Sequence, residues 1–106
     1  MVVILVTMWC PYSKGLELGK KFLELQSKFP IQPFEKQLVI GAGRPVKGAY
    51  KLIYVVGAKT EKYEETYSLV AKRMSFYAEI EGFEYEIETL MSARKMIEGE
   101  GLKMPR

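Results

Sequence analysis

The sequence contains no histidine, no asparagine and no aspartate, so all 13 of its acidic residues are glutamate. Without histidine, the chain can form neither a Ser-His nor a Cys-His catalytic pair, and no imidazole is present to bind a metal ion. These absences exclude many classes of hydrolase and metalloenzyme. We therefore expect no catalytic residue, no metal site and no cofactor, and a binding protein rather than an enzyme.

The composition also resembles that of proteins adapted to heat. Asparagine, which degrades readily at high temperature, is absent, while lysine and glutamate supply most of the charge. Six methionines point the other way, because methionine is also thermolabile.

Cysteine and long apolar runs are scarce as well. Cys10 is the single cysteine, so no internal disulfide can form, and a cytoplasmic location is expected. No apolar run reaches the ~20 residues that span a bilayer. The opening residues 1–9 are too few for a secretory signal and lack its basic start. We expect no membrane partner, and a net charge of only +3 gives no argument for nucleic acid.

What is present predicts one domain over residues 1–106, organised around residues 60–90. Thr60 is a candidate N-cap of a helix, and Gly82 is a candidate for the left-handed turn that ends it. A strand follows, with Phe83, Tyr85 and Ile87 on the face opposite the glutamates at 84, 86 and 88. The helix has an apolar stripe at steps of four and three residues: Tyr63, Tyr67, Val70, Met74 and Tyr77.

The first thirty residues predict a strand and a helix. Residues 2–9 are apolar on both faces, as in a central strand. Ser13 is a candidate N-cap, and Gly15 and Gly19 indicate a close approach of the helix backbone to the sheet. The inner stripe of this helix is Leu18, Phe22, Leu25 and Phe29.

The remaining elements are two strands and a short helix. Residues 37–43 predict an edge strand, residues 43–48 a hairpin loop, and residues 49–57 a central strand. Ser92 is a candidate cap for a helix over residues 93–97, followed by an irregular tail at 98–106.

This order of elements is typical of the α+β, ferredoxin-like βαββαβ fold with a four-stranded antiparallel sheet. Right-handed crossovers place both helices on one face, so the other face of the two apolar central strands is left open. An exposed apolar face of that size predicts a homodimer formed through the open sheet face.

Four segments stand out: Thr7-Met8-Trp9, Lys62-Tyr63-Glu64-Glu65, residues 78–89 and Leu90-Met91-Ser92-Ala93. They are similar to uncharacterised small members of the dimeric α/β-barrel superfamily, and the resemblance extends over residues 1–97. It implies two ferredoxin-like chains packed sheet against sheet. Members of this superfamily include monooxygenases, isomerases, haem enzymes and ligand-sensing domains, and the haem enzymes use an axial histidine that this chain lacks.

The segment Trp9-Cys10-Pro11-Tyr12-Ser13 resembles the Cys-Pro-Tyr-Ser active site of monothiol glutaredoxins. A thiol at a helix N-terminus has a lowered pKa, so a thiol-redox protein is one alternative function. The glutaredoxin fold also needs a cis-proline strand facing the cysteine and a Gly-Gly turn, and the chain has neither. We therefore expect Cys10 to be structural.

Glu84, Glu86 and Glu88 form a row of carboxylates about 7 Å apart along one strand. Such a row could attract Mg²⁺ or Ca²⁺. It is also typical of an edge strand that avoids pairing with other sheets, which is the interpretation we favour.

The many aromatic side chains predict either a ligand pocket or simply a core. We expect a homodimer that binds a small apolar or aromatic ligand, with Trp9, Tyr12, Tyr54 and Glu86 in the wall of the site. A structural or interaction module without a ligand is the other alternative. RNA binding is not expected, because Ala49 and Lys51 occupy the two positions where an RNA recognition motif carries stacking aromatics.

Overall fold

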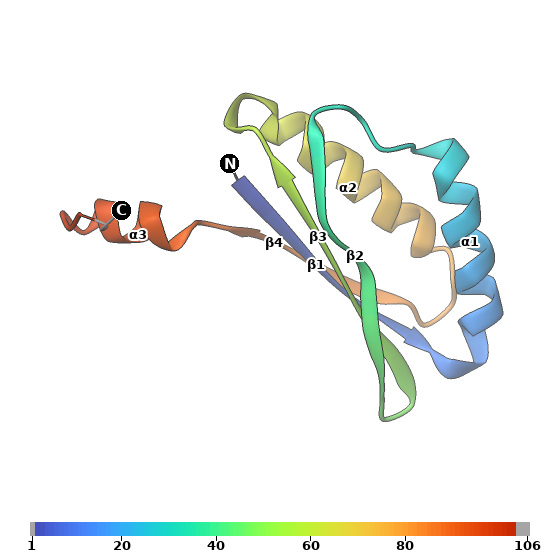
Figure 1. Cartoon of the computed structure of the whole chain (residues 1–106). Coiled ribbons are helices and arrows are strands. Elements are labelled where there is room, and N and C mark those ends of the chain that lie inside the picture. The colour runs from blue at the N-terminus through green and yellow to red at the C-terminus, as the bar shows by residue number, and fades with distance from the viewer. Residues whose placement is uncertain (1, 104–106) are drawn as a thin grey trace.

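The computed structural model describes residues 2–103 of the chain, and their elements alternate much as the sequence predicts (Figure 1). Two short 3₁₀ turns, Tyr12–Lys14 and Thr60–Lys62, precede the two long helices. The elements are β1 Val2–Pro11, α1 Gly15–Lys28, β2 Glu35–Val46, β3 Ala49–Ala58, α2 Tyr63–Tyr77, β4 Glu84–Leu90 and α3 Ala93–Gly99.

The four strands form one antiparallel sheet in the order β2-β3-β1-β4. The predicted central positions of β1 and β3 are therefore confirmed, as are the edge positions of β2 and β4. Helices α1 and α2 lie on the same face of this sheet (Figure 1). The fold is thus α+β, with one face of the sheet covered by helices and the other left open.

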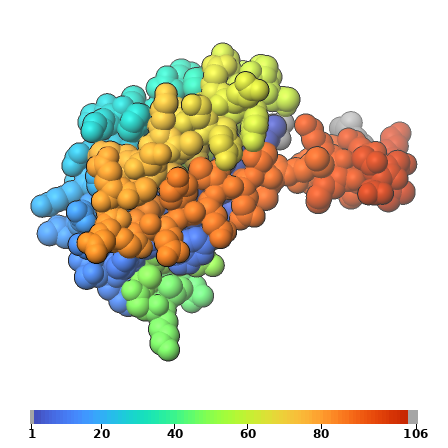
Figure 2. All heavy atoms as spheres, turned by 180° about the vertical axis from the view of Figure 1, so that it is seen from behind, coloured from blue at the N-terminus to red at the C-terminus, as the bar shows by residue number. Residues whose placement is uncertain are grey.

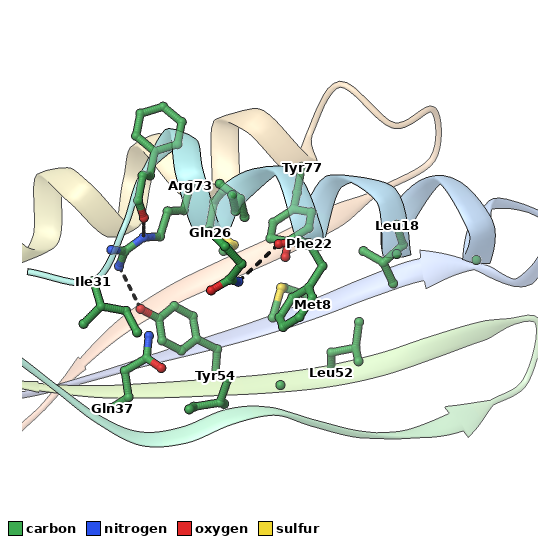
Figure 3. Close-up of a pocket in the computed structure, with 17 residues that line it drawn as sticks. Met8, Leu18, Phe22, Gln26, Ile31, Gln37, Leu52, Tyr54, Arg73 and Tyr77 are labelled. Atoms are coloured by element: carbon green, nitrogen blue, oxygen red, sulfur yellow. Dashed lines mark hydrogen bonds between the residues drawn. The ribbon is translucent and has the colours of Figure 1, made fainter.

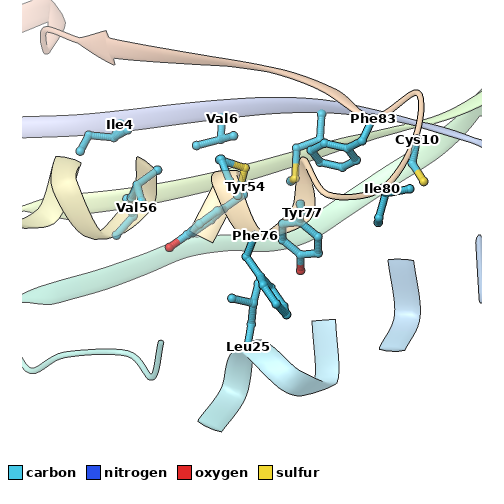
Figure 4. Close-up of a cluster of buried hydrophobic side chains, with 13 residues drawn as sticks. Ile4, Val6, Cys10, Leu25, Tyr54, Val56, Phe76, Tyr77, Ile80 and Phe83 are labelled. Atoms are coloured by element: carbon cyan, nitrogen blue, oxygen red, sulfur yellow. The ribbon is translucent and has the colours of Figure 1, made fainter. Parts of the chain in front are cut away.

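The core lies between α2 and the helix-covered face of the sheet (Figure 4). Alternate residues of β1 point into it, from Ile4 and Val6 to Met8 and Cys10. The predicted stripe of α2 is confirmed: Val70, Met74 and Tyr77 are buried, and Tyr63 and Tyr67 pack against the core at its edge.

The predicted N-caps of the two long helices are wrong. Ser13 and Thr60 lie inside the 3₁₀ turns, and neither α1 nor α2 has a side-chain cap. At the turn Thr60–Lys62 the backbone takes over part of that role, because the amide of Lys62 donates to the carbonyl of Lys59 at 2.9 Å. The cap of α3 is confirmed, since the Ser92 hydroxyl accepts from the amide of Lys95 at 3.2 Å.

Strand β2 is longer than predicted, so the hairpin loop shrinks to Lys47 and Gly48. The register between β2 and β3 shifts twice, and Gly41, with a positive φ of 64°, lies within the second shift, between Val39 and Ala42. These irregularities allow the strand to continue through Gly43. Pro45, which has no amide proton to donate, is tolerated because β2 lies at the edge of the sheet.

The chain after β4 leaves the body of the domain. Helix α3 lies at the end of β4, away from the other elements (Figures 1 and 2). Residues 98 and 99 belong to α3, so the predicted irregular tail begins later, and residues 104–106 lie outside the described residues. Within residues 2–103, no helix has the length and apolar character needed to cross a membrane.

Candidate ligand-binding site

A cavity of about 470 Å³ lies between α1 and the helix-covered face of the sheet (Figure 3). Most of its wall is apolar. The inner stripe of α1 forms one side, and β1, β2 and β3 form the floor. Side chains of α2 close it at the back: Arg73, Met74 and Tyr77.

The cavity exists because α1 carries glycine where a larger side chain would reach the sheet. Gly15 and Gly19 both line the cavity. A Cβ added at Gly19 would meet no heavy atom within 4 Å, so the predicted close approach of the helix backbone to the sheet is wrong there. At Gly15 the nearest atom would be Cε2 of Tyr50, at 3.3 Å. Gly19 therefore leaves space, whereas Gly15 allows the close approach to the sheet that the sequence predicted.

Helix α1 is held above the cavity by contacts with α2 and the turn after it. The Nζ of Lys21 lies 2.9 Å from Oε1 of Glu79 and 4.0 Å from the ring centroid of Phe76. The hydrogen bond from Lys21 lowers the pKa of Glu79. Because these contacts hold α1 against α2, α1 is kept in place without packing directly on the sheet at Gly19.

Exposed apolar side chains mark the mouth of the cavity. Phe22 is 42% exposed, Ile31 50% and Ile40 62%, and all three line the cavity. A ligand entering here would cover apolar surface that is otherwise in water.

The polar end of the cavity is organised by Arg73, which is buried. Its guanidinium makes a two-pronged ion pair with Glu35, including an Nη2–Oε2 distance of 2.8 Å. It also donates to the carbonyls of Phe29 and Pro30, at 3.2 Å and 3.1 Å, and to the Tyr54 hydroxyl at 2.9 Å. All five N–H groups of the guanidinium therefore have partners, and its charge is balanced.

The Tyr77 hydroxyl is different. Tyr77 is only 7% exposed and lines the cavity, and its hydroxyl has no hydrogen-bond partner among residues 2–103. Since none of the fully buried side-chain oxygens or nitrogens of these residues lacks a partner, the hydroxyl is accessible from the cavity. Burial raises the pKa of Tyr77 to about 12, so the phenol keeps its proton at neutral pH. Gln26 also lines the cavity, and its amide nitrogen donates to the carbonyl of Phe22 at 3.2 Å (Figure 3).

Of the four residues predicted for the ligand site, Tyr54 lines this cavity. Tyr12 lies at the β2–β3 hairpin, where its hydroxyl donates to the carbonyl of Val46 and its ring meets Tyr50 edge-on. Trp9 and Glu86 belong to the open face of the sheet, so the structure does not bring them together with Tyr54. Their role in a site between two sheets stays a prediction.

The sequence argument missed Tyr77 and Gly19 as parts of a site. Tyr77 was visible as the last member of the α2 stripe, and Gly19 as a glycine next to the α1 stripe. Nothing in the pattern distinguishes a stripe position that faces a void from one that faces packed atoms.

Cys10 is fully buried against the core. Burial, together with the negative charge of Glu17, raises the pKa of its thiol. A nucleophilic thiol needs a lowered pKa and access to its substrate, so this environment favours the structural role that we predicted for Cys10.

The open face is apolar in its middle and charged at two edges. Val3, Leu5 and Trp9 of β1 and Ile53 and Val55 of β3 are half-buried. Strand register gives rows across the sheet: Arg44, Lys51, Trp9 and Glu84 in one, and Ala42, Ile53, Thr7 and Glu86 in the next. Within residues 2–103 no three Cys, His, Asp or Glu side chains are placed to hold a metal ion.

Comparisons with known proteins give the fold only. No family model matches the chain, and no curated protein matches it. A solved structure, the de novo designed protein Foldit4, is similar with a TM-score of 0.59 and 17% identity, covering 86% of this chain and 97% of the designed one. That likeness supports a small four-stranded antiparallel sheet with helices.

Proposed function

We propose that the protein binds a small apolar or aromatic molecule in the cavity between α1 and the sheet. The observation that carries this proposal is the cavity itself: about 470 Å³, mostly apolar, with a few polar groups at one end. Ligand sites in proteins commonly enclose about 300–1,000 Å³ and have this division between an apolar wall and a few polar groups.

Packing energetics also supports the proposal. An empty apolar cavity costs stability, and a larger side chain at Gly19, where an added Cβ meets no neighbour, could fill part of it. Glycine inside a helix costs up to about 1 kcal/mol relative to alanine. The empty cavity and the helix glycine beside it both lower stability, and the binding energy of a ligand in the cavity would offset these costs.

A neutral apolar dye, N-phenyl-1-naphthylamine, tests the proposal by its fluorescence on binding. We expect saturable binding that Gly19→Leu abolishes, since the leucine side chain would occupy the cavity. Gly99→Leu, on α3 and also without neighbours around an added Cβ, is the matched control and should bind the dye normally. Equal binding by both variants would place the dye elsewhere.

We also propose that the fold is ferredoxin-like, that the chain belongs to the dimeric α/β-barrel superfamily and that two copies pair through their open faces. The element order and the strand order support this. So does charge: Glu84, Glu86 and Glu88 lie at the β4 edge, and Lys36 and Arg44 lie on β2 at the opposite edge. A second copy with β4 against β2 of the first would bring unlike charges together twice, by symmetry.

The C-terminal arm is a further observation in favour of a second copy. The arm runs from Met91 to Leu102, after the last residue of β4 and outside the body of the domain (Figure 1). Its apolar side chains are exposed, including Met91, Met96 and Leu102. Contact with a partner chain would bury these side chains together with the open face.

A further inference from the structure

We propose that the cavity selects an uncharged ligand with a hydrogen-bond acceptor, such as a ketone or aldehyde oxygen, which accepts from the Tyr77 hydroxyl. This inference rests on the proposed function and adds the chemical class of the ligand.

The argument begins with the hydroxyl that lacks a partner. Tyr77 is 93% buried, being 7% exposed, and it lines the cavity, while no buried side-chain oxygen or nitrogen of the described residues is left without a partner. The Tyr77 hydroxyl is therefore open to the cavity rather than sealed in the core. A ligand that covers this hydroxyl must supply a hydrogen-bond partner or leave it unsatisfied at a cost in free energy. The Tyr77 phenol is protonated at neutral pH because burial raises its pKa to about 12, so it can donate. A ligand acceptor would satisfy it.

The second step concerns charge. Arg73 is the one charged residue among the described residues that line the cavity. Its guanidinium is already engaged by Glu35, by two backbone carbonyls and by the Tyr54 hydroxyl. A carboxylate or phosphate entering the cavity would lose its hydration and find no unpaired cation, which is costly. A cationic ligand would be equally unfavourable, because no carboxylate lines the cavity.

The third step is the position of the donor. Tyr77 comes from α2 at the back of the cavity, whereas the exposed Phe22 and Ile40 mark its mouth. A ligand with an acceptor at one end can therefore place that end inside and lay its apolar body along the α1 stripe (Figure 3). Gln26, which also lines the cavity, offers a side-chain carbonyl for a donor on the same ligand.

Three naphthalenes of nearly equal shape separate these possibilities: 2-acetonaphthone, 2-isopropylnaphthalene and 2-naphthoate. Each competes against N-phenyl-1-naphthylamine at pH 7. We expect the ketone to bind about fivefold more tightly than the hydrocarbon, as one net hydrogen bond requires. The naphthoate should bind at least about 100-fold more weakly than the ketone, because its charge is not balanced.

Tyr77→Phe then tests the donor directly. The variant keeps the ring and should bind ketone and hydrocarbon equally, with unchanged affinity for the hydrocarbon. Tyr63→Phe is the control, since its hydroxyl meets Thr89 at 2.7 Å and lies outside the cavity. If Tyr77→Phe keeps the preference for the ketone, or if naphthoate binds most tightly, the inference is overturned while the proposed function stands. If neither the dye nor any naphthalene binds, both fail.

Discussion

Two buried side chains of α2, four residues apart, differ in whether their polar groups have hydrogen-bond partners. The Arg73 guanidinium has a partner for every N–H, and Tyr77 has none for its hydroxyl among residues 2–103. Arg73 therefore links α2 to the start of β2 through a fully paired guanidinium. The Tyr77 hydroxyl is a polar group directed at a cavity. The same helix thus contributes both to stability and to the candidate site.

The raised pKa of Tyr77 predicts how stability depends on alkaline pH. The unfolded chain loses this proton near pH 10.0, whereas the folded chain keeps it until about pH 12. The free energy of unfolding should therefore be undiminished below pH 10 and fall as the pH rises towards 12. The difference corresponds to about 2–3 kcal/mol. Urea unfolding between pH 9 and 12 measures this difference. The free energy of unfolding of Tyr77→Phe should fall correspondingly less over the same pH range. Identical pH profiles for the two proteins would contradict the assignment.

The ion pair of Arg73 and Glu35 should show strong coupling. Arg73→Met leaves the Glu35 carboxylate buried and unbalanced, so we expect a loss of about 3–5 kcal/mol in the free energy of unfolding. Glu35→Leu alone should also be costly, and the double variant should lose clearly less than the sum.

The control is Arg94→Met, whose partner Glu98 lies 3.7 Å away in a half-exposed pair. That substitution should change stability by no more than about 0.5–1 kcal/mol. Additive losses for Arg73→Met and Glu35→Leu would show that the pair is not coupled.

At the scale of elements, periodicity predicted the strands and helices because their apolar faces must meet a core. The α2 stripe and the alternation of β4 follow from this rule directly. The starts of the two long helices, α1 and α2, were not predicted correctly, because the choice between a side-chain cap and a 3₁₀ turn depends on how the chain enters from β1 and β3. The pairing of Arg73 with Glu35 was not predicted, because it joins segments 38 residues apart.

The cavity could not be predicted for a related reason. Whether Gly19 marks a close approach or a void depends on the distance between α1 and the sheet, which periodicity does not contain. That distance is set elsewhere, in part by Lys21 and Phe76.

Replacement of two glycines by alanine should change the free energy of unfolding in opposite directions. Gly19→Ala removes a helix penalty and meets no neighbour, so it should raise the free energy of unfolding by up to about 1 kcal/mol. Gly82→Ala should lower it by about 1–2 kcal/mol, because φ is 83° there and the new Cβ would lie 2.8 Å from Cγ of Pro11. Urea midpoints provide the comparison. Destabilisation by Gly19→Ala would mean that α1 lies closer to the sheet than described.

At the scale of the whole molecule, one open sheet face and one protruding arm are the surfaces that the single chain leaves uncovered. The sequence predicted the open face because β1 and β3 carry apolar residues on both faces, while the helices cover only one. It did not predict the arm, because exposed methionines in a short helix resemble any surface helix.

The proposed dimer has a direct test by light scattering at micromolar concentration. Ile53, in the middle of the open face, should be buried between the two copies, so Ile53→Glu should give a monomer that keeps its fold by circular dichroism. Leu23→Glu is the control, since Leu23 is 70% exposed on α1, on the other side of the sheet. A wild-type mass of about 12 kDa, that of the single 12.2 kDa chain, would refute the dimer.

The measurement that tests the central claim most directly is a methyl NMR titration with 2-acetonaphthone. Protein labelled at methionine methyls offers two reporters inside the cavity, Met8 and Met74, and two on the arm, Met91 and Met96. The account predicts saturable shifts of Met8 and Met74, with Met91 and Met96 unchanged, and loss of those shifts in Gly19→Leu. Shifts confined to Met91 and Met96, or no shift at any of the four, would contradict a ligand site between α1 and the sheet.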